Sequence, residues 1–88
     1  MANEGQIARE VGELRHDIRR LGTQRAEDGK WVVKYGVLFN ETEQKYEALL
    51  GTLIAARKKG VIDFKGQMLL KGAHDNTDIV LLQEPDDS

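Results

Sequence analysis

Few residues of this 88-residue chain are of the types that carry out catalysis. There is no cysteine, and the single serine is Ser88, so the usual sets of a nucleophile with an adjacent base cannot be built. His16 falls opposite the apolar stripe of a helical segment, which places it in solvent. His74 and Asp75 could form an oriented base, but in a polar loop such side chains more commonly satisfy their own backbone. Together with Asp78 they are too few for a metal site.

Composition limits the class of protein further. The chain is 40% hydrophobic and 32% charged, which is typical of one soluble globular domain. Its longest apolar stretch, residues 48–56, is far shorter than the ~20 residues of a membrane span. Glycine-rich phosphate-binding motifs are absent, and the N-terminus has no apolar signal segment. We therefore expect a cytoplasmic protein that is not an enzyme, uses no cofactor or metal, binds no membrane and is a monomer with one core.

The charged residues are unevenly distributed along the chain. Thirteen Lys and Arg against 15 Asp and Glu give a net charge of −2, and this overall balance argues against a nucleic-acid binder. Acidic residues gather in residues 75–88, whereas a cluster of basic residues lies within fifteen positions and consists of Arg57, Lys58, Lys59, Lys65 and Lys71. Such polarity is typical of a surface that steers an acidic protein partner. A basic run at positions 57–59 would also arise simply because it complements a helix dipole.

The first half of the sequence predicts a helix and a strand. A stripe at helical spacing, which ends at Gly22, consists of Ile7, Val11, Leu14, Ile18 and Leu21. Residues 31–35 alternate with the period of two expected of a short strand, which Gly36 ends. Residues 37–39 begin a new apolar segment and allow a further short helix.

A long helix is predicted next. Asn40 and Glu43 have the spacing of a capping box, and the helix is expected to run to about Lys59, before Gly60. One face of this helix is smooth and nearly uncharged, and it carries Ala48, Gly51, Thr52 and Ala55. This face either lies under the first helix or contacts a partner protein. It offers almost none of the long polar side chains with which a helix reads DNA bases.

The remainder of the sequence predicts a β-hairpin with a long tip. Apolar residues at 61–64 and 68–70 lead into a polar loop over 71–78, and a second strand follows at 79–82. The order of these elements predicts an α+β fold of the winged-helix type, with three helices packed on a small antiparallel sheet and the hairpin as the wing. We expect this domain to span residues 6–83, with disordered segments at 1–5 and 84–88.

Three blocks of the sequence closely resemble the costars family. They read VKYGVLF at 33–39, YEALLGTLIAARKKG at 46–60 and MLLKGAHDNTDIVLL at 68–82. This family includes small free-standing proteins and the C-terminal domain of the muscle protein called striated muscle activator of Rho signalling. The resemblance covers residues 7–83, in order and with similar spacing, which is far more specific than one short motif.

The resemblance implies a winged-helix-like fold and a role in actin dynamics and cell motility, associated with the cytoskeleton and without enzyme activity. The matching muscle domain binds actin, and small members are associated with the severing protein cofilin. The six residues 40–45 make a connection that looks shorter than in the small members and nearer the muscle type. The resemblance therefore leaves open whether the partner is the actin filament or a regulator such as cofilin.

Residue types, not the family, indicate where a partner would bind. The predicted contact residues are the basic residues Arg57, Lys58, Lys59, Lys65 and Lys71, the loop residues Gly72, His74, Asp75 and Asn76, and the small residues Ala48, Thr52 and Ala55. Two other interpretations stay open at this point. A winged-helix fold could bind nucleic acid, and the domain could simply bridge other proteins of a signalling pathway.

Overall fold

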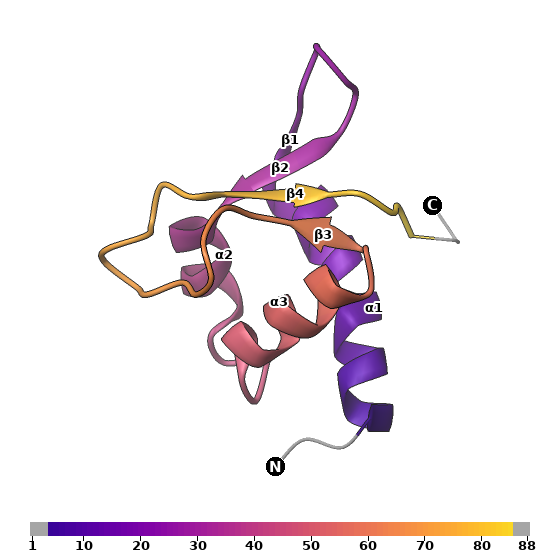
Figure 1. Ribbon diagram of the computed structural model, residues 1–88, viewed down its shortest axis with the longest axis vertical. Helices are drawn as coiled ribbons and strands as arrows, with labels where there is room; N and C mark the ends of the chain where they lie inside the picture. Colours follow the sequence, from indigo (N-terminus) through magenta and orange to yellow (C-terminus); the bar gives the residue numbers. More distant parts are fainter. Residues whose placement is uncertain (1–3, 86–88) are drawn as a thin grey trace.

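The computed structural model describes residues 4–85, which form three helices and four short strands (Figure 1). The helices are α1 (Glu4–Leu21), α2 (Tyr35–Thr42) and α3 (Leu49–Lys58). The strands are β1 (Thr23–Gln24), β2 (Trp31–Lys34), β3 (Ile62–Asp63) and β4 (Asp78–Leu81). The predicted first helix and the strand at 31–35 are confirmed, although Tyr35 already belongs to α2.

The four strands form one antiparallel sheet in the order β1-β2-β4-β3. Val32 pairs with Thr23 on one side and with Val80 on the other, and Ile62 pairs with Leu81. Along β4 the side chains alternate between buried and more exposed, as in a sheet covered on one face. The helices cover that face (Figure 1). The predicted α+β class, with three helices on a small antiparallel sheet, is confirmed.

The core lies between the helices and the covered face of the sheet. The α1 stripe contributes Leu14 and Ile18, which are fully buried, and they belong to one apolar cluster with Leu38, Leu53 and Ile79. Burial of a Leu or Ile side chain contributes about 1.5–3 kcal/mol, so this stripe is what holds α1 in place.

Gly22 ends α1 where β2 crosses the helix. Its amide donates to the carbonyl of Ile18 at 2.8 Å. A Cβ at this position would lie 2.3 Å from the carbonyl oxygen of Val32 and 2.7 Å from that of Ile18. The crossing therefore requires glycine.

The long helix predicted from Asn40 to Lys59 is wrong in its first half. Asn40 lies inside α2, so it is no N-cap, and the helix ends at Thr42. Residues 43–48 form a connector, and α3 begins at Leu49. The reason is tertiary, because Tyr46 in this connector turns into the core and hydrogen-bonds to Asp17 of α1. These contacts outweigh the helix-forming tendency of the local sequence.

The predicted strand at 68–70 is also wrong. These residues run as irregular chain, with Leu69 buried and Met68 and Leu70 about half exposed. Pairing between β3 and β4 stops at Asp63 and Val80, so the chain that follows has no partner strand. The long segment between β3 and β4 passes from the sheet to α2 (Figure 1). Strand β1 was not predicted.

The packed chain extends beyond the predicted limits of 6 and 83. Helix α1 begins at Glu4, the Glu84 carboxylate lies 3.7 Å from the Arg19 guanidinium, and Pro85 is buried. The ends predicted to be disordered lie, for residues 1–3 and 86–88, outside the described residues. Among the helices that are described, none is long and apolar enough to cross a membrane.

Candidate protein-binding surface

The C-terminal end of α3 carries exposed basic side chains. Lys58 is in the last turn, Lys59 caps it, and both are exposed, as is Lys65 just after β3. None of the three forms an ion pair within residues 4–85. We call Lys58, Lys59 and Lys65 the basic end of α3. The position of the two helix residues also complements the helix dipole.

Arg57 joins the two parts of this basic end. Its Nη1 donates to the carbonyls of Phe64 at 3.2 Å and Gly66 at 2.6 Å, and the guanidinium lies 4.0 Å from the centre of the Phe64 ring. These contacts tie the segment after β3 to α3 and place Lys65 beside the helix end. Arg57 was predicted to steer a partner, but its side chain is committed to these internal contacts and acts by positioning its neighbours.

The loop at 70–76 is held together by its own polar side chains. The amide of Leu70 donates to His74 Nδ1 at 2.9 Å, and the amide of Gly72 donates to Asp75 Oδ1 at 2.7 Å. Lys71 Nζ lies 3.1 Å from Asp75 Oδ2. The Gly72 amide first, and Lys71 second, lower the pKa of Asp75. Of the two interpretations of His74 and Asp75, a loop that satisfies its own backbone is therefore confirmed.

This loop packs on α2 and not on α3. Lys71 Nζ lies 5.9 Å from the centre of the Phe39 ring, and the amide of Gly36 donates to the carbonyl of Asp75 at 3.0 Å. A Cβ on Gly36 would lie only 2.8 Å from that of Asp75, so glycine is needed for this close approach. Lys71, Gly72, His74, Asp75 and Asn76 thus form a second surface, separate from the basic end of α3 (Figure 1).

The smooth face predicted for the long helix is partly internal. Thr52 is only 2% exposed, and its hydroxyl donates to Glu10 Oε1 of α1 at 2.8 Å. Its prediction as a partner contact is therefore wrong, because at this position the face lies under α1. Ala48 is exposed and Ala55 half-buried, so these two stay available as predicted contacts.

A buried polar cluster around Asp17 was missed by the sequence reasoning. Asp17 is 2% exposed and accepts hydrogen bonds from Tyr46 Oη at 2.5 Å, Lys45 Nζ at 3.0 Å and Arg20 Nη2 at 3.1 Å. Burial raises the pKa of Asp17, but these three donors outweigh it and hold the pKa below its usual value. Burial and the Asp17 carboxylate both raise the pKa of Tyr46 well above its usual range.

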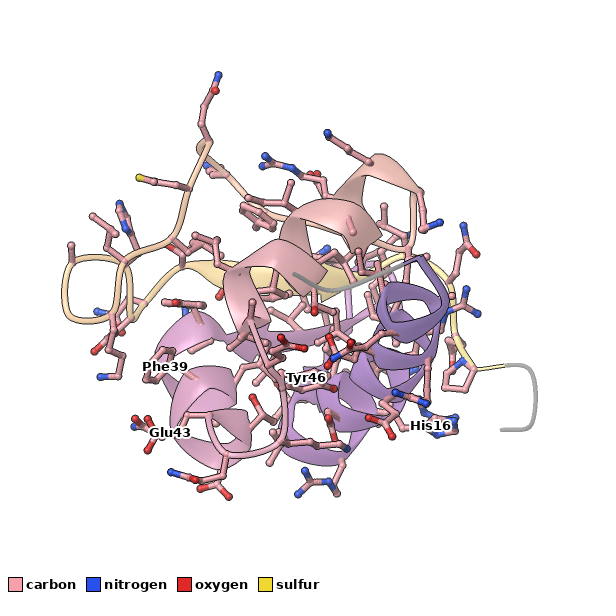
Figure 2. All side chains as sticks on the ribbon, turned by 90° about the horizontal axis from the view of Figure 1, so that it is seen from below. His16, Phe39, Glu43 and Tyr46 are labelled. Atoms are coloured by element: carbon pink, nitrogen blue, oxygen red, sulfur yellow. The ribbon has the colours of Figure 1, made fainter. Side chains whose placement is uncertain are left out.

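This cluster fixes the connector between α2 and α3, and so the place where α3 begins. Figure 2 shows Tyr46 in the interior, while Glu43 of the same connector points away from the molecule. The sequence signal for the cluster is an acidic residue directly beside Ile18 of the apolar stripe, on the margin of the buried face of α1. No group of three or more metal-ligating side chains occurs in the described part of the chain.

The uncovered face of the sheet holds a shallow groove of about 610 Å³. Its apolar floor includes Phe64, Val80 and Leu82. The charged side chains around it are of both signs, namely Arg25, Lys30, Lys65, Asp28, Asp63 and Asp78. The groove therefore has no preference of charge that would indicate a particular ligand.

Three helices on a small antiparallel sheet define a small α+β domain, and comparison with known proteins shows its family. Residues 6–82 match the model of the Costars family, so the chain belongs to that family and the predicted resemblance is confirmed. It is 54% identical to Costars family protein ABRACL of Danio rerio, an alignment that covers 89% of this chain and 98% of the relative. Protein costars of Dictyostelium discoideum is 51% identical, with 89% and 96% covered.

A solved structure shows the same fold. The solution structure of human HSPC280 protein matches with a TM-score of 0.83 and 44% sequence identity. The match covers 91% of this chain and 95% of that one. The two proteins therefore share the arrangement of three helices on a small sheet, although more than half of their aligned residues differ.

Proposed function

We propose that this chain is a non-catalytic regulator of actin cytoskeleton dynamics and cell motility. It acts in the cytoplasm, in association with the cytoskeleton, by binding actin filaments or an actin regulator such as cofilin. The observation that carries the proposal is membership of the Costars family, for which the sequence resemblance implies an actin-related role. The polarised surface agrees with it.

The basic end of α3 is the surface that supports this function best. Its three lysines are exposed and make no ion pair within residues 4–85, so they are available to an acidic protein surface such as that of actin. Exposed charges of this kind speed encounter and fix orientation more than they add affinity. The loop at 70–76, which packs on α2 and which we call the α2-packed loop, would add a surface of fixed shape for the partner. Its own hydrogen bonds hold it in one conformation.

Filament co-sedimentation tests the proposal. The purified chain is centrifuged with polymerised actin, with and without cofilin, and both proteins are quantified in the pellet. Pelleting with filaments alone identifies a direct filament binder. A chain that stays in the supernatant but changes the amount of pelleted cofilin identifies an adaptor whose partner is cofilin. The absence of both effects would refute the proposed function.

A further inference from the structure

The buried acidic residues of α1 and its arginines lie on different faces of the helix, with the exposed Glu13 at the edge between them. Glu10 and Asp17 point inward and are 7% and 2% exposed. The opposite arc, about 140° wide at 3.6 residues per turn, carries Arg9, Arg15, Arg19 and Arg20. We call these four residues the α1 arginine face. In the sequence the acidic and basic charges of this segment nearly cancel, so the face emerges only when burial separates them.

Neighbouring residues orient two of these guanidinium groups. The Arg19 guanidinium lies 5.6 Å from the centre of the Trp31 ring, and Arg20 is anchored on Asp17. Small residues occupy the same arc, and a Cβ added to Gly12 would meet no other atom within 4 Å. A second chain can therefore come close to the helix between the arginines. Planar guanidinium groups held in this way match the geometry of carboxylates.

A carboxylate already lies on this face in the folded chain. Glu84 Oε1 is 3.7 Å from Arg19 Nε, and Gln83 Oε1 accepts a long hydrogen bond of 3.4 Å from Arg15 Nη2. The fit is incomplete, because Arg15 Nε is buried without a hydrogen-bond acceptor among the described residues. A buried donor left in this state costs free energy. The side chains of Gln83 and Glu84 thus satisfy this face only in part, and a better acidic ligand could replace Glu84 on it.

We propose that the α1 arginine face is a docking surface for an acidic segment of a partner protein, for which Glu84 competes. Asp17 Oδ1 lies 3.1 Å from Arg20 and Glu84 Oε1 lies 3.7 Å from Arg19, whereas Arg9 and Arg15 form no ion pair within residues 4–85. The exposed Glu13 stands at the edge of the arc. The surface is distinct from the α2-packed loop, since His16 of this helix and Phe39 of α2 lie on opposite sides of the molecule (Figure 2). This inference goes beyond the proposed function, because it adds a second partner site on another surface.

Peptide binding at low salt tests this surface without actin. The probe is a fluorescein-labelled peptide of alternating Asp and Glu, and its anisotropy is measured as the full chain is added. The double variant Arg9→Gln/Arg19→Gln should bind about tenfold more weakly. The matched control is Lys30→Gln/Lys34→Gln, which has the same net charge, belongs to neither the α1 arginine face nor the basic end of α3, and should bind within about twofold of the wild type. An equal loss in both variants, or no loss in the first, would overturn the proposal.

Two further variants keep the test decisive if the double variant is unstable. Arg9→Gln alone removes an exposed side chain that makes no ion pair within residues 4–85, and it should weaken the peptide about threefold. Glu84→Gln should tighten binding about threefold, because it frees Arg19, whereas Glu41→Gln on α2 changes net charge equally and should not. Equal tightening by both would overturn the competition by Glu84. None of these outcomes depends on filament binding.

Discussion

Replacing Asp17 with Asn tests whether a buried polar cluster positions α3. The substitution keeps the shape of the side chain but removes the negative charge of the carboxylate, which accepts hydrogen bonds from Lys45, Arg20 and Tyr46. We expect a clear loss of stability together with a loosened connector between α2 and α3, because these hydrogen bonds are what hold residues 45 and 46 on α1.

The size of the expected stability loss follows from how exposed the hydrogen-bond donors of Asp17 are. Hydrogen bonds to a charged group contribute about 1.5–3 kcal/mol each. The side chains of Lys45 and Arg20 are 41% and 57% exposed, so water replaces much of what they lose. Tyr46 can still donate to the amide oxygen of an asparagine. The expected net loss is therefore about 2 kcal/mol, well below the sum of the three bonds.

The loss should depend on pH with a definite sign. The pKa of Asp17 is lower in the folded chain than its unfolded value of about 3.9. Its stabilising effect is therefore complete above the unfolded pKa and is lost as the pH falls through the folded pKa. The difference in stability between wild type and variant should be constant near neutrality and should shrink below about pH 4.

Urea unfolding followed by the fluorescence of Trp31, the single tryptophan, measures this difference. With an m-value of about 1 kcal/mol/M, the midpoint should fall by about 2 M. The control is Asp78→Asn, which removes an exposed carboxylate 2.7 Å from Lys34 Nζ and should cost at most about 0.5 kcal/mol. Equal losses for the two variants, or a difference at Asp17 that persists unchanged to the lowest pH, would refute the reasoning.

Four other predictions concern three glycines and the rival ligand class. Gly12→Ala should raise the free energy of unfolding by about 0.5–1 kcal/mol in thermal melts, because the site is helical and open. Gly22→Ala should lower it by more than about 2 kcal/mol, because the new Cβ meets the Val32 carbonyl; an equal response at both sites would contradict the crossing geometry. Gly36→Ala should push the 70–76 loop off α2 and speed hydrogen exchange of the residue-36 amide, which donates to the Asp75 carbonyl, while unchanged exchange would show that the loop adapts. Duplex DNA should not bind even at low salt, and a steep dependence of affinity on salt would instead revive the nucleic-acid interpretation.

The elements that the sequence predicts well are those decided by local periodicity. The α1 stripe and the alternation of β2 reflect burial on one face, and both stand in the structure. The connector could not be predicted in this way, because the contact that decides it joins Asp17 and Tyr46, which are 29 residues apart. The irregular course of residues 68–70 likewise depends on where the pairing of β3 with β4 stops.

The candidate site was predictable to a similar extent. The basic end of α3 follows from a local run of charge and a helix stop at Gly60. Thr52 was predicted as a partner contact because the predicted helix included Tyr46, whose side chain would then mark the buried face on the other side, but Tyr46 lies outside α3. The α1 arginine face was not predicted, because the acidic residues of the helix nearly balance its arginines in the sequence. Only the structure shows that Glu10 and Asp17 are buried.

The most direct test of the central claim is filament co-sedimentation of matched variants, with cofilin present and absent. The account predicts that Lys58→Gln/Lys59→Gln, shown to be folded by its urea midpoint, loses about tenfold in filament binding or in its effect on pelleted cofilin. Arg9→Gln/Arg19→Gln, with the same net charge, should behave as the wild type does. Wild-type behaviour of the lysine variant, beside a wild-type chain that binds, would contradict the claim that the basic end of α3 is the binding surface.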